Sequence, residues 1–252
     1  MNTEENKTET KERIAKVMAR AGLCSRRDAE VWIRAGRVIL NGTQLDSPAI
    51  TVGPEDEIMV DGKILPQEDD VRLWLYHKPR GLITTHKDPE GRPTVFDNLP
   101  RDMPRVISVG RLDVNSEGLL LLTNSGTLSR FFEHPQTQIP RIYRVRVFGK
   151  VDRTLPQQVQ RGLTIEGIYY GPMTLTVEES QGANTWLNLT LYEGKNREIR
   201  RIIQHFGLSL SRLIRVSYGP FNLATLAPHQ GWEVPTRRLK ADLTDLGYFG
   251  GS

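Results

Sequence analysis

The segment from Val106 to Asn124, VISVGRLDVNSEGLLLLTN, collects side chains that could do chemistry. The segment begins with a β-branched run and continues with a stretch that contains Asp, Arg, Asn, Ser and Glu. Four leucines follow near its end. This order predicts a strand, a polar loop and a buried strand, which would hold the polar groups rigidly. Asp113 could there transfer a proton or attack as a nucleophile. It could instead form an Asx-turn and pair with Arg111, the interpretation that residue types alone favour.

The rest of the sequence lacks the familiar catalytic signatures. It contains no phosphate-binding Gly-x-x-x-x-Gly-Lys-Ser/Thr loop, no Gly-x-Ser-x-Gly elbow and no His-Glu-x-x-His pair. The five histidines, at positions 77, 86, 134, 205 and 229, are scattered. We therefore predict no metal site and no cofactor. Any catalysis must come from Asp, Glu, Tyr, Lys or Arg, which suits proton transfer or nucleophilic attack by a carboxylate.

The net charge of +4 is distributed unevenly along the chain. Residues 11–37 hold eight Lys/Arg against three Asp/Glu, and residues 195–215 hold six against one. Everything else is net acidic, so the positive charge is concentrated in two segments that lie far apart in sequence. Such clustering is typical of a site for nucleic acid, although two solvated helix faces would give the same count. If RNA is the partner, its ribose or base is the natural target of a catalytic carboxylate.

The first basic segment has the pattern of two short helices. Apolar residues between Ile14 and Ala21 recur at spacings of three and four, and Gly22 ends that helix. Ser25, with Asp28 three positions further on, predicts the N-cap of a second helix, which stops at Gly36. Two type I′ hairpin turns between short strands are then predicted, at Asn41-Gly42 and Asp61-Gly62.

Composition divides the chain into two domains. Residues 66–70 carry no apolar side chain and are predicted to link a domain of residues 11–65 to a larger domain of residues 71–252. In the larger domain, strand patterns occur at 73–76, 143–147, 173–177 and 186–191, and helix patterns at 125–133, 155–161 and 197–206. Because these patterns alternate irregularly, we expect an α+β domain built on a mixed, largely antiparallel β-sheet flanked by helices.

The chain has the composition of a soluble, cytoplasmic protein. Residues 1–10 are polar and acidic, which predicts a disordered tail rather than a signal or transit peptide. The longest aliphatic run, residues 119–122, is far shorter than the roughly 20 apolar residues that span a membrane. A single cysteine, Cys24, excludes an intramolecular disulfide. We expect a monomer without membrane association.

Residues 13–38, RIAKVMARAGLCSRRDAEVWIRAGRV, resemble an S4 domain, a small RNA-binding module named after a ribosomal protein. The resemblance implies an α-L-like fold whose helical face lies against the backbone of folded RNA. It makes the cationic side chains of that face candidate RNA contacts: Arg13, Lys16, Arg20, Arg26, Arg27, Arg34 and Arg37. Such side chains neutralise phosphates, so they contribute affinity without reading sequence.

The segment 106–124 resembles the signature of the RsuA/RluB family of S4-domain-containing ribosomal RNA pseudouridine synthases. The family pattern Gly-Arg-Leu-Asp, a short gap and Gly-Leu-Leu-Leu-Leu-Thr is matched without interruption. Further matches are KPRG at 78–81, RIYRV at 141–145 and EGKNREIRR at 193–201. The length and the motif variant are nearest to the RluB branch, which acts on the large ribosomal subunit. The resemblance implies the pseudouridine synthase fold and a reaction without a cofactor.

Carried over residue by residue, the resemblance implies Asp113 as the catalytic aspartate, Tyr143 as the tyrosine that stacks on the target base, and Arg200 as the cation paired with the aspartate. Pseudouridine formation breaks the bond from ribose C1′ to base N1, turns the base and joins C1′ to C5. The carboxylate could attack C1′, attack the base at C6, or remove the proton from C2′, and the sequence leaves these routes open. In each route, an arginine within ion-pair distance offsets the desolvation of the carboxylate.

Further RNA contacts are expected around this site, from Lys78, Arg111, Lys195, Asn196 and Arg197. The pattern of residues 197–206 places Arg197 and Arg200 on one face of a helix. The N-terminus of that helix would add its own positive end to a phosphate-binding surface. Without the resemblance, the same residues describe an ordinary amphipathic helix.

The sequence therefore predicts a ribosomal RNA pseudouridine synthase that acts on 23S RNA of the large subunit, free or in an assembly intermediate. Two other functions stay open: an enzyme for 16S RNA of the small subunit, and a non-catalytic RNA-binding ribosome-assembly protein of the same fold. The set of Asp113, Tyr143 and Arg200 argues against the last of these, because an acid facing a polyanion weakens a pure binding surface.

Overall fold

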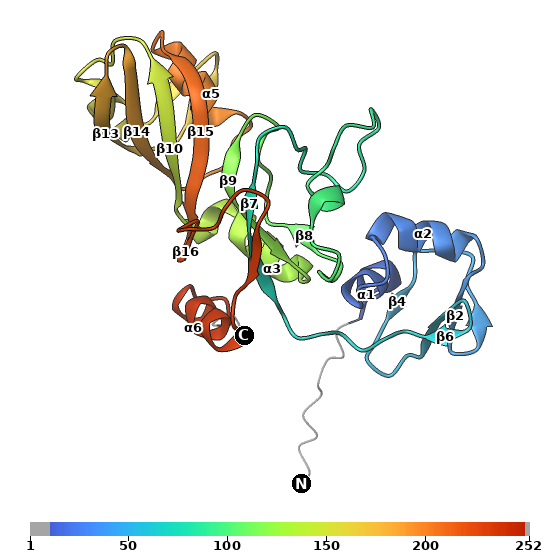
Figure 1. Cartoon of the computed structure of the whole chain (residues 1–252). Coiled ribbons are helices and arrows are strands. Elements are labelled where there is room, and N and C mark those ends of the chain that lie inside the picture. The colour runs from blue at the N-terminus through green and yellow to red at the C-terminus, as the bar shows by residue number, and fades with distance from the viewer. Residues whose placement is uncertain (1–10, 250–252) are drawn as a thin grey trace. The chain divides into compact units, whose positions relative to one another are not determined.

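The computed structural model of the protein describes residues 11–249, so the tail expected at 1–10 lies outside the described residues. Two compact units make up the chain, Met1–Val71 and Arg72–Ser252 (Figure 1). The division falls one residue beyond the segment 66–70 in which we expect a linker. Each unit has its own apolar core, and each is described by itself below.

The first unit contains two helices, α1 (Ile14–Arg20) and α2 (Arg26–Arg34). Gly22 follows the C-cap of α1 with φ of 80°, the left-handed conformation that commonly ends a helix. At the start of α2, the Ser25 hydroxyl accepts from the Asp28 N–H, and the Asp28 carboxylate accepts from the Ser25 N–H. The predicted capping box is therefore present.

Short strands complete the first unit as a two-stranded pair and a four-stranded antiparallel sheet. The pair is β1 (Glu12–Arg13) with β4 (Thr51–Val52), and the sheet contains β2 (Val38–Leu40), β3 (Thr43–Gln44), β5 (Ile58–Val60) and β6 (Lys63–Ile64). The turns at Asn41-Gly42 and Asp61-Gly62 have positive φ at both residues, which confirms the two type I′ hairpins. Ile14, Met18 and Ile33 are fully buried in the core of this unit.

A nine-stranded mixed sheet organises the second unit. Its main path runs in the order β13, β14, β10, β15, β9, β7, β17, while β8 pairs with β9 and β16 with β15. The bounds are β7 (Leu73–Lys78), β8 (Ile107–Ser108), β9 (Glu117–Thr123), β10 (Arg141–Phe148), β13 (Thr174–Gln181), β14 (Asn184–Leu191), β15 (Ser209–Tyr218), β16 (Phe221–Asn222) and β17 (Gly231–Glu233). Only β9 and β15 are parallel among these pairs, which confirms the expected mixed, largely antiparallel sheet.

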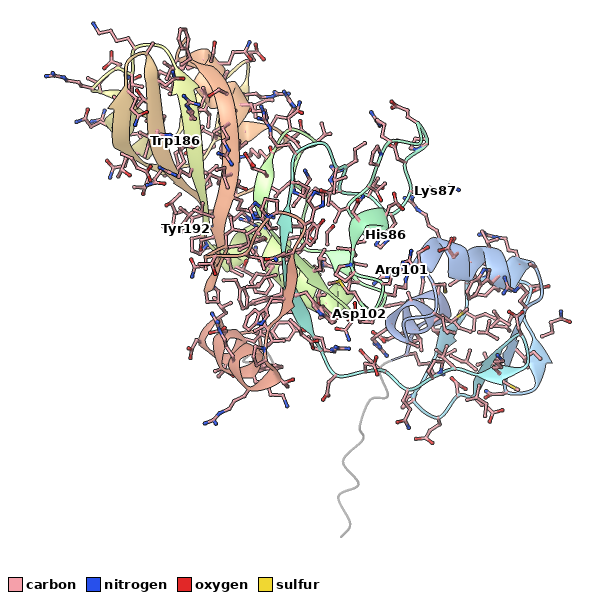
Figure 2. All side chains as sticks on the ribbon, viewed as in Figure 1. His86, Lys87, Arg101, Asp102, Trp186 and Tyr192 are labelled. Atoms are coloured by element: carbon pink, nitrogen blue, oxygen red, sulfur yellow. The ribbon has the colours of Figure 1, made fainter. Side chains whose placement is uncertain are left out.

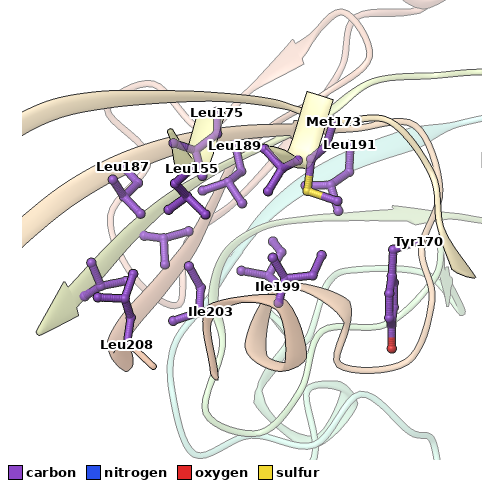
Figure 3. Packing of buried hydrophobic residues seen from close by; sticks show 14 of the residues in the cluster. Leu155, Tyr170, Met173, Leu175, Leu187, Leu189, Leu191, Ile199, Ile203 and Leu208 are labelled. Atoms are coloured by element: carbon purple, nitrogen blue, oxygen red, sulfur yellow. The ribbon is translucent and has the colours of Figure 1, made fainter. Parts of the chain in front are cut away.

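Helices and one separate hairpin complete the second unit. They are α3 (Gly126–Glu133), α4 (Leu155–Gln160), α5 (Glu198–His205), α6 (Thr236–Asp245), the short 3-10 turns η1 (Phe96–Asn98) and η2 (Pro135–Thr137), and the hairpin of β11 (Leu163–Ile165) with β12 (Ile168–Tyr170). In Figure 3, Ile199 and Ile203 of α5 face Leu187 and Leu189 of β14. The apolar stripe of α5 thus closes a core beneath one face of β13, β14, β10 and β15.

The two halves of the sheet meet in one short parallel ladder. Strands β9 and β15 pair only through Glu117 with Ile214 and Gly118 with Arg215. A Cβ on Gly118 would lie 2.3 Å from the Arg215 carbonyl oxygen, and φ there is +105°, so the close approach requires glycine. Arg215 reinforces the ladder, because its Nε donates to the Leu119 carbonyl at 2.7 Å.

Several elements of the second unit are absent from the sequence-based prediction. They are the central strand β15, the strands β16 and β17, the β11–β12 hairpin and the helix α6. The predicted helices at 125–133, 155–161 and 197–206 agree with α3, α4 and α5 to within a residue at each end. In the described part of the chain, every helix is too short or too polar to cross a membrane.

Candidate active site

Asp113 lies in the loop between β8 and β9, where the strand, loop and strand pattern predicted it. The chain turns directly after it, since the Ser116 N–H donates to the Asp113 carbonyl at 2.9 Å. Leu112, on its other side, is buried, and its carbonyl accepts from the Thr84 hydroxyl at 2.9 Å. The loop is therefore fixed on both sides of Asp113, whose side chain keeps 33% of its surface exposed.

Lys78 holds the same loop from the core side. It is fully buried, and its ammonium donates to the carbonyls of Pro79 at 2.9 Å, Ser116 at 2.8 Å and Val114 at 3.5 Å. Burial lowers the pKa of Lys78 to about 8, and the nearby Asp113 carboxylate acts in the opposite direction. The expectation that Lys78 contacts RNA is wrong in this structure, because a fully buried side chain has no surface to offer and braces the loop instead.

Two guanidinium groups approach the Asp113 carboxylate. Arg200 Nε lies 3.4 Å from Asp113 Oδ2, and Arg197 Nη1 lies 3.7 Å from the same oxygen. Arg200 Nη2 also donates to the Asn115 carbonyl at 3.1 Å and to the Ser116 hydroxyl at 3.3 Å. One arginine thus neutralises the carboxylate and fixes the loop that carries it.

Arg200 and Arg197 differ in burial. Arg200 is in the first turn of α5 with 17% of its side chain exposed, whereas Arg197 is 55% exposed. Arg197 is the N-cap, with φ of 52°, so it precedes the helix instead of sharing the helical face that we expected. Burial lowers the pKa of Arg200, Asp113 raises it, and the neighbouring cations Arg197 and Arg80 lower it again. Because Arg200 is partly desolvated, its attraction to the carboxylate is less screened than that of Arg197.

Tyr143, on β10, is partly buried and packs against both cores of the second unit. One of these cores contains Leu112, the residue before Asp113. In the sheet, Tyr143 is opposite Leu189 on one side and Arg215 on the other. The structure therefore places the ring on the face of the sheet that α5 covers, against the core that contains Leu112 of the Asp113 loop.

A pair of carboxyl groups, the buried Glu198 and the partly exposed Glu193, shapes the segment before α5. Glu198 is 4% exposed and accepts from the Lys195 backbone N–H at 3.1 Å. Glu193 accepts from the Gly171 N–H at 2.8 Å and from the Lys195 ammonium. Burial and, after it, the charge of Glu193 raise the pKa of Glu198 to about 8. Sequence reasoning missed this pair, because a glutamate inside the charged run EGKNRE gives no sign of burial.

We expect Glu198→Gln to change how the stability of the protein depends on pH. The folded protein keeps the Glu198 proton up to a pKa of about 8, whereas the unfolded chain loses it near 4.5. Stability therefore falls as pH rises through this window. Gln mimics the protonated form, so the variant does not lose stability in this way. The Tm of the variant minus the Tm of the wild type should therefore increase by several degrees as pH rises from 5 to 8. Thermal unfolding at several pH values measures this, and parallel curves would contradict it.

The other side chains expected to contact RNA near this site differ in their ion pairing. Arg111 is exposed and makes no ion pair within residues 11–249. The Lys195 ammonium binds Glu193 and lies 5.8 Å from the centre of the Tyr169 ring. Asn196 is exposed beside it. Within the same described range, no three His, Cys, Asp or Glu side chains are grouped as a metal site would require.

In the first unit, ion pairs occupy much of the candidate RNA-binding face. Four of its seven cations pair with acids: Lys16 and Arg20 with Glu12, Arg34 with Glu30, and Arg37 with Asp61. Arg13, Arg26 and Arg27 are exposed and have no acidic partner among the residues that the structure describes. Arg26 and Arg27 open α2, where the helix N-terminus favours anions as well.

Two family models match this chain. Residues 12–58 match the S4 domain, and residues 72–205, more than half of the chain, match the RNA pseudouridylate synthase model. The chain belongs to the RNA pseudouridylate synthase family. This synthase is accordingly an isomerase that converts uridine to pseudouridine in RNA, with an S4 domain preceding its catalytic domain.

Similar proteins agree with this assignment. An uncharacterized RNA pseudouridine synthase of Rickettsia felis is 48% identical over 91% of this synthase and 99% of the relative. The ribosomal large subunit pseudouridine synthase B of Yersinia pestis is 42% identical over 88% of this synthase and 71% of the relative. The crystal structure of a pseudouridylate synthase, 24% identical, shares the fold with a TM-score of 0.64 over 91% of this synthase and 99% of that chain. The resemblance drawn from the motifs is thereby confirmed.

Proposed function

We propose that this synthase isomerises a uridine in the RNA of the large ribosomal subunit, with Asp113 as its catalytic carboxylate. The contact between Asp113 and Arg200, in a loop fixed on both sides, carries the proposal. The name of the Yersinia pestis relative specifies the large ribosomal subunit, which supports this choice of substrate. Ribosomal RNA, free or in an assembly intermediate, is then the partner of the S4 domain.

The surroundings of Asp113 suit a group that must act as an anion. Within the described chain, its carboxylate contacts the two arginines through Oδ2, which leaves Oδ1 available to a substrate. The reaction moves the C1′ bond from N1 to C5 and the C5 proton to N1, so it balances without an oxidant or a reductant. An anionic oxygen serves each of the three routes, whether it attacks C1′ or C6 or removes the C2′ proton.

Tyr143 is proposed to present its ring to the target base. A uridine can reach Asp113 only after it leaves the stack of its neighbours, and a flat aromatic ring compensates for the lost stacking. The position of Tyr143 against the core that holds Leu112 supports this role. Its hydroxyl is also a candidate for assisting the final loss of the C5 proton.

Reversing the charges of Arg26 and Arg27 to Glu should raise KM without slowing the chemical step. Both side chains are exposed and free of acidic partners in the described residues, so with Arg13 they are the best placed of the S4 cations to neutralise phosphates. The slope of log K against log salt should fall by about 0.9 for each duplex phosphate contact that is lost. Single-turnover rates over a range of RNA and salt concentrations measure both effects.

Lys63→Glu is the matched control for this variant, because Lys63 is exposed on β6 of the same unit. It should leave KM and its salt dependence close to wild type. A lower rate at saturating RNA in the Arg26/Arg27 variant would contradict a role limited to binding.

Deleting the gene and mapping pseudouridines in ribosomal RNA tests the proposed substrate. Chemical labelling followed by primer extension should reveal one site missing from the large-subunit RNA, and the wild-type gene should restore it. A gene encoding Asp113→Asn should not restore it. Loss of a small-subunit site instead would reassign the substrate, and an unchanged map of both RNAs would refute ribosomal RNA as the target.

A further inference from the structure

Strands β13, β14, β10 and β15 have one buried and one open face. Val145, Leu187 and Leu213 point into the core that α5 closes. Residues that alternate with them point from the opposite face, because successive side chains of a strand project to opposite sides. These half-buried or exposed side chains include Arg144 and Arg146 of β10, Trp186 of β14 and Arg212 of β15. Figure 2 labels Trp186 on this part of the sheet.

Two arginines stand directly opposite each other on the open face. Arg146 is in register with Arg212 on one side and with Trp186 on the other. Like charges in such positions destabilise an antiparallel pair. Arg212 is compensated by Glu117, with contacts of 2.6 and 3.2 Å, but Arg146 has no acidic partner among the described side chains. An arginine left uncompensated beside another arginine indicates a surface that meets an anion.

Arg144 adds a cation and a flat surface to this face. Its guanidinium lies 4.3 Å from the centre of the Trp186 ring, and its Nε contacts Glu178 at 2.7 Å. Arginine stacked on tryptophan makes a planar, positively charged platform. Unpaired bases stack on platforms of this kind in proteins that bind single strands.

Arg80 connects the open face to the active site. Its Nη2 donates to the Ser211 carbonyl at 3.4 Å, at the part of β15 that extends past the pairing with β9. It is exposed, lacks an acidic partner within the described chain, and is one of the cations that act electrostatically on Arg200. Ser211 is followed by Arg212, so cations continue from the active site over the end of β15 onto the open face. We call these four residues the arginine track: Arg80, Arg212, Arg146 and Arg144.

We propose that the arginine track binds the single-stranded RNA next to the target uridine. A nucleotide drawn out of its helix unstacks its neighbours, so unpaired RNA must leave the active site on some path. The track begins at Arg80, ends at the Trp186 platform, and includes two arginines, Arg80 and Arg146, that have no acidic partner in the described chain and can bind phosphates. Through this track the catalytic domain would bind unpaired RNA, whereas the S4 domain binds folded RNA.

The track can be tested by measuring how the full-length protein binds and crosslinks to an oligouridine of about 20 nucleotides that carries one 4-thiouridine. Every protein includes Arg26→Glu and Arg27→Glu to reduce binding by the S4 domain. Arg146→Glu is compared with Arg153→Glu, which reverses an exposed arginine before α4. Fluorescence anisotropy should show about three- to tenfold weaker binding for Arg146→Glu only, with the salt slope lower by about 0.7, the value for one single-strand phosphate. Irradiation should crosslink the probe to β10 or β14 only when Arg146 is present.

Arg146→Glu is expected to fold, because Glu would face Arg212 across the ladder. Its Tm verifies this, and Arg146→Gln replaces it if the Tm falls. Equal binding by the Arg146 and Arg153 variants, or crosslinks confined to other segments, would overturn the proposal. The proposal would also be overturned if Arg146→Glu bound polyglutamate more weakly but bound oligouridine as the wild type does. That result would assign the track to an acidic protein partner. The probe has no ribosomal sequence, so these outcomes are independent of the proposed ribosomal substrate.

Discussion

An Asp113→Asn variant is expected to bind RNA with wild-type affinity and to form no detectable pseudouridine. Asn keeps the size of the side chain that contacts Arg200, but it lacks the anionic oxygen that every route requires. The loss in rate should be on the order of 10⁴-fold or more, as for removal of an essential catalytic group in other enzymes. Single-turnover assays with excess enzyme measure the rate, and equilibrium binding measures the affinity.

Asp152→Asn is the control for Asp113→Asn, because it makes the same chemical change at a different position. Asp152 is an exposed carboxylate that accepts from the Thr154 N–H and hydroxyl in the turn before α4. That variant should retain full activity. If Asp113→Asn retained a rate within tenfold of wild type, catalysis would have to be assigned to another group.

Replacing Arg200 by Gln should cost far more activity than the same change at Arg197. Arg200 is largely buried and contacts the Asp113 carboxylate, the Asn115 carbonyl and the Ser116 hydroxyl, whereas Arg197 is mostly exposed. Its removal leaves the carboxylate without its buried cation and takes away two of the hydrogen bonds that hold the loop. We expect kcat to fall on the order of 10²- to 10³-fold for Arg200→Gln and less than about tenfold for Arg197→Gln.

Arg200→Lys separates charge from geometry at this position. Lysine restores the positive charge but cannot reproduce the planar set of donors with which Arg200 reaches both Asp113 and the loop. Its single-turnover rate should therefore lie between those of wild type and Arg200→Gln. Equal losses in Arg197→Gln and Arg200→Gln would contradict the ranking by burial.

The immediate surroundings of Asp113 could be predicted from sequence because the signals involved are local. A β-branched run, a polar stretch and four leucines are enough to place a loop between two strands. The capping box of Ser25 and Asp28 is another local signal that the structure confirms. Pairing between residues far apart in sequence, such as Asp113 with Arg200, rested on the family resemblance and not on any pattern of spacing.

Tertiary contacts explain what the sequence could not reveal. Lys78 was expected to contact RNA, and only the fold shows that the side chain is buried and that three carbonyls of two segments surround its ammonium. Strand β15 escaped prediction because it carries charged residues and because two register shifts against β10 disturb the alternation of its side chains. Glu198 likewise belongs to a charged run, and its burial depends on the packing of α5.

The single parallel ladder between β9 and β15 separates the groups to which we assign catalysis. Asp113 belongs to the half of the sheet that contains β9, whereas Arg200 and Tyr143 belong to the half that contains β15. The ladder acts as a joint of two residue pairs, and each half has a core of its own. A displacement of about 1 Å at that joint would separate the Asp113 carboxylate from the Arg200 guanidinium while both cores stay intact. On warming, this enzyme should therefore become inactive before it melts.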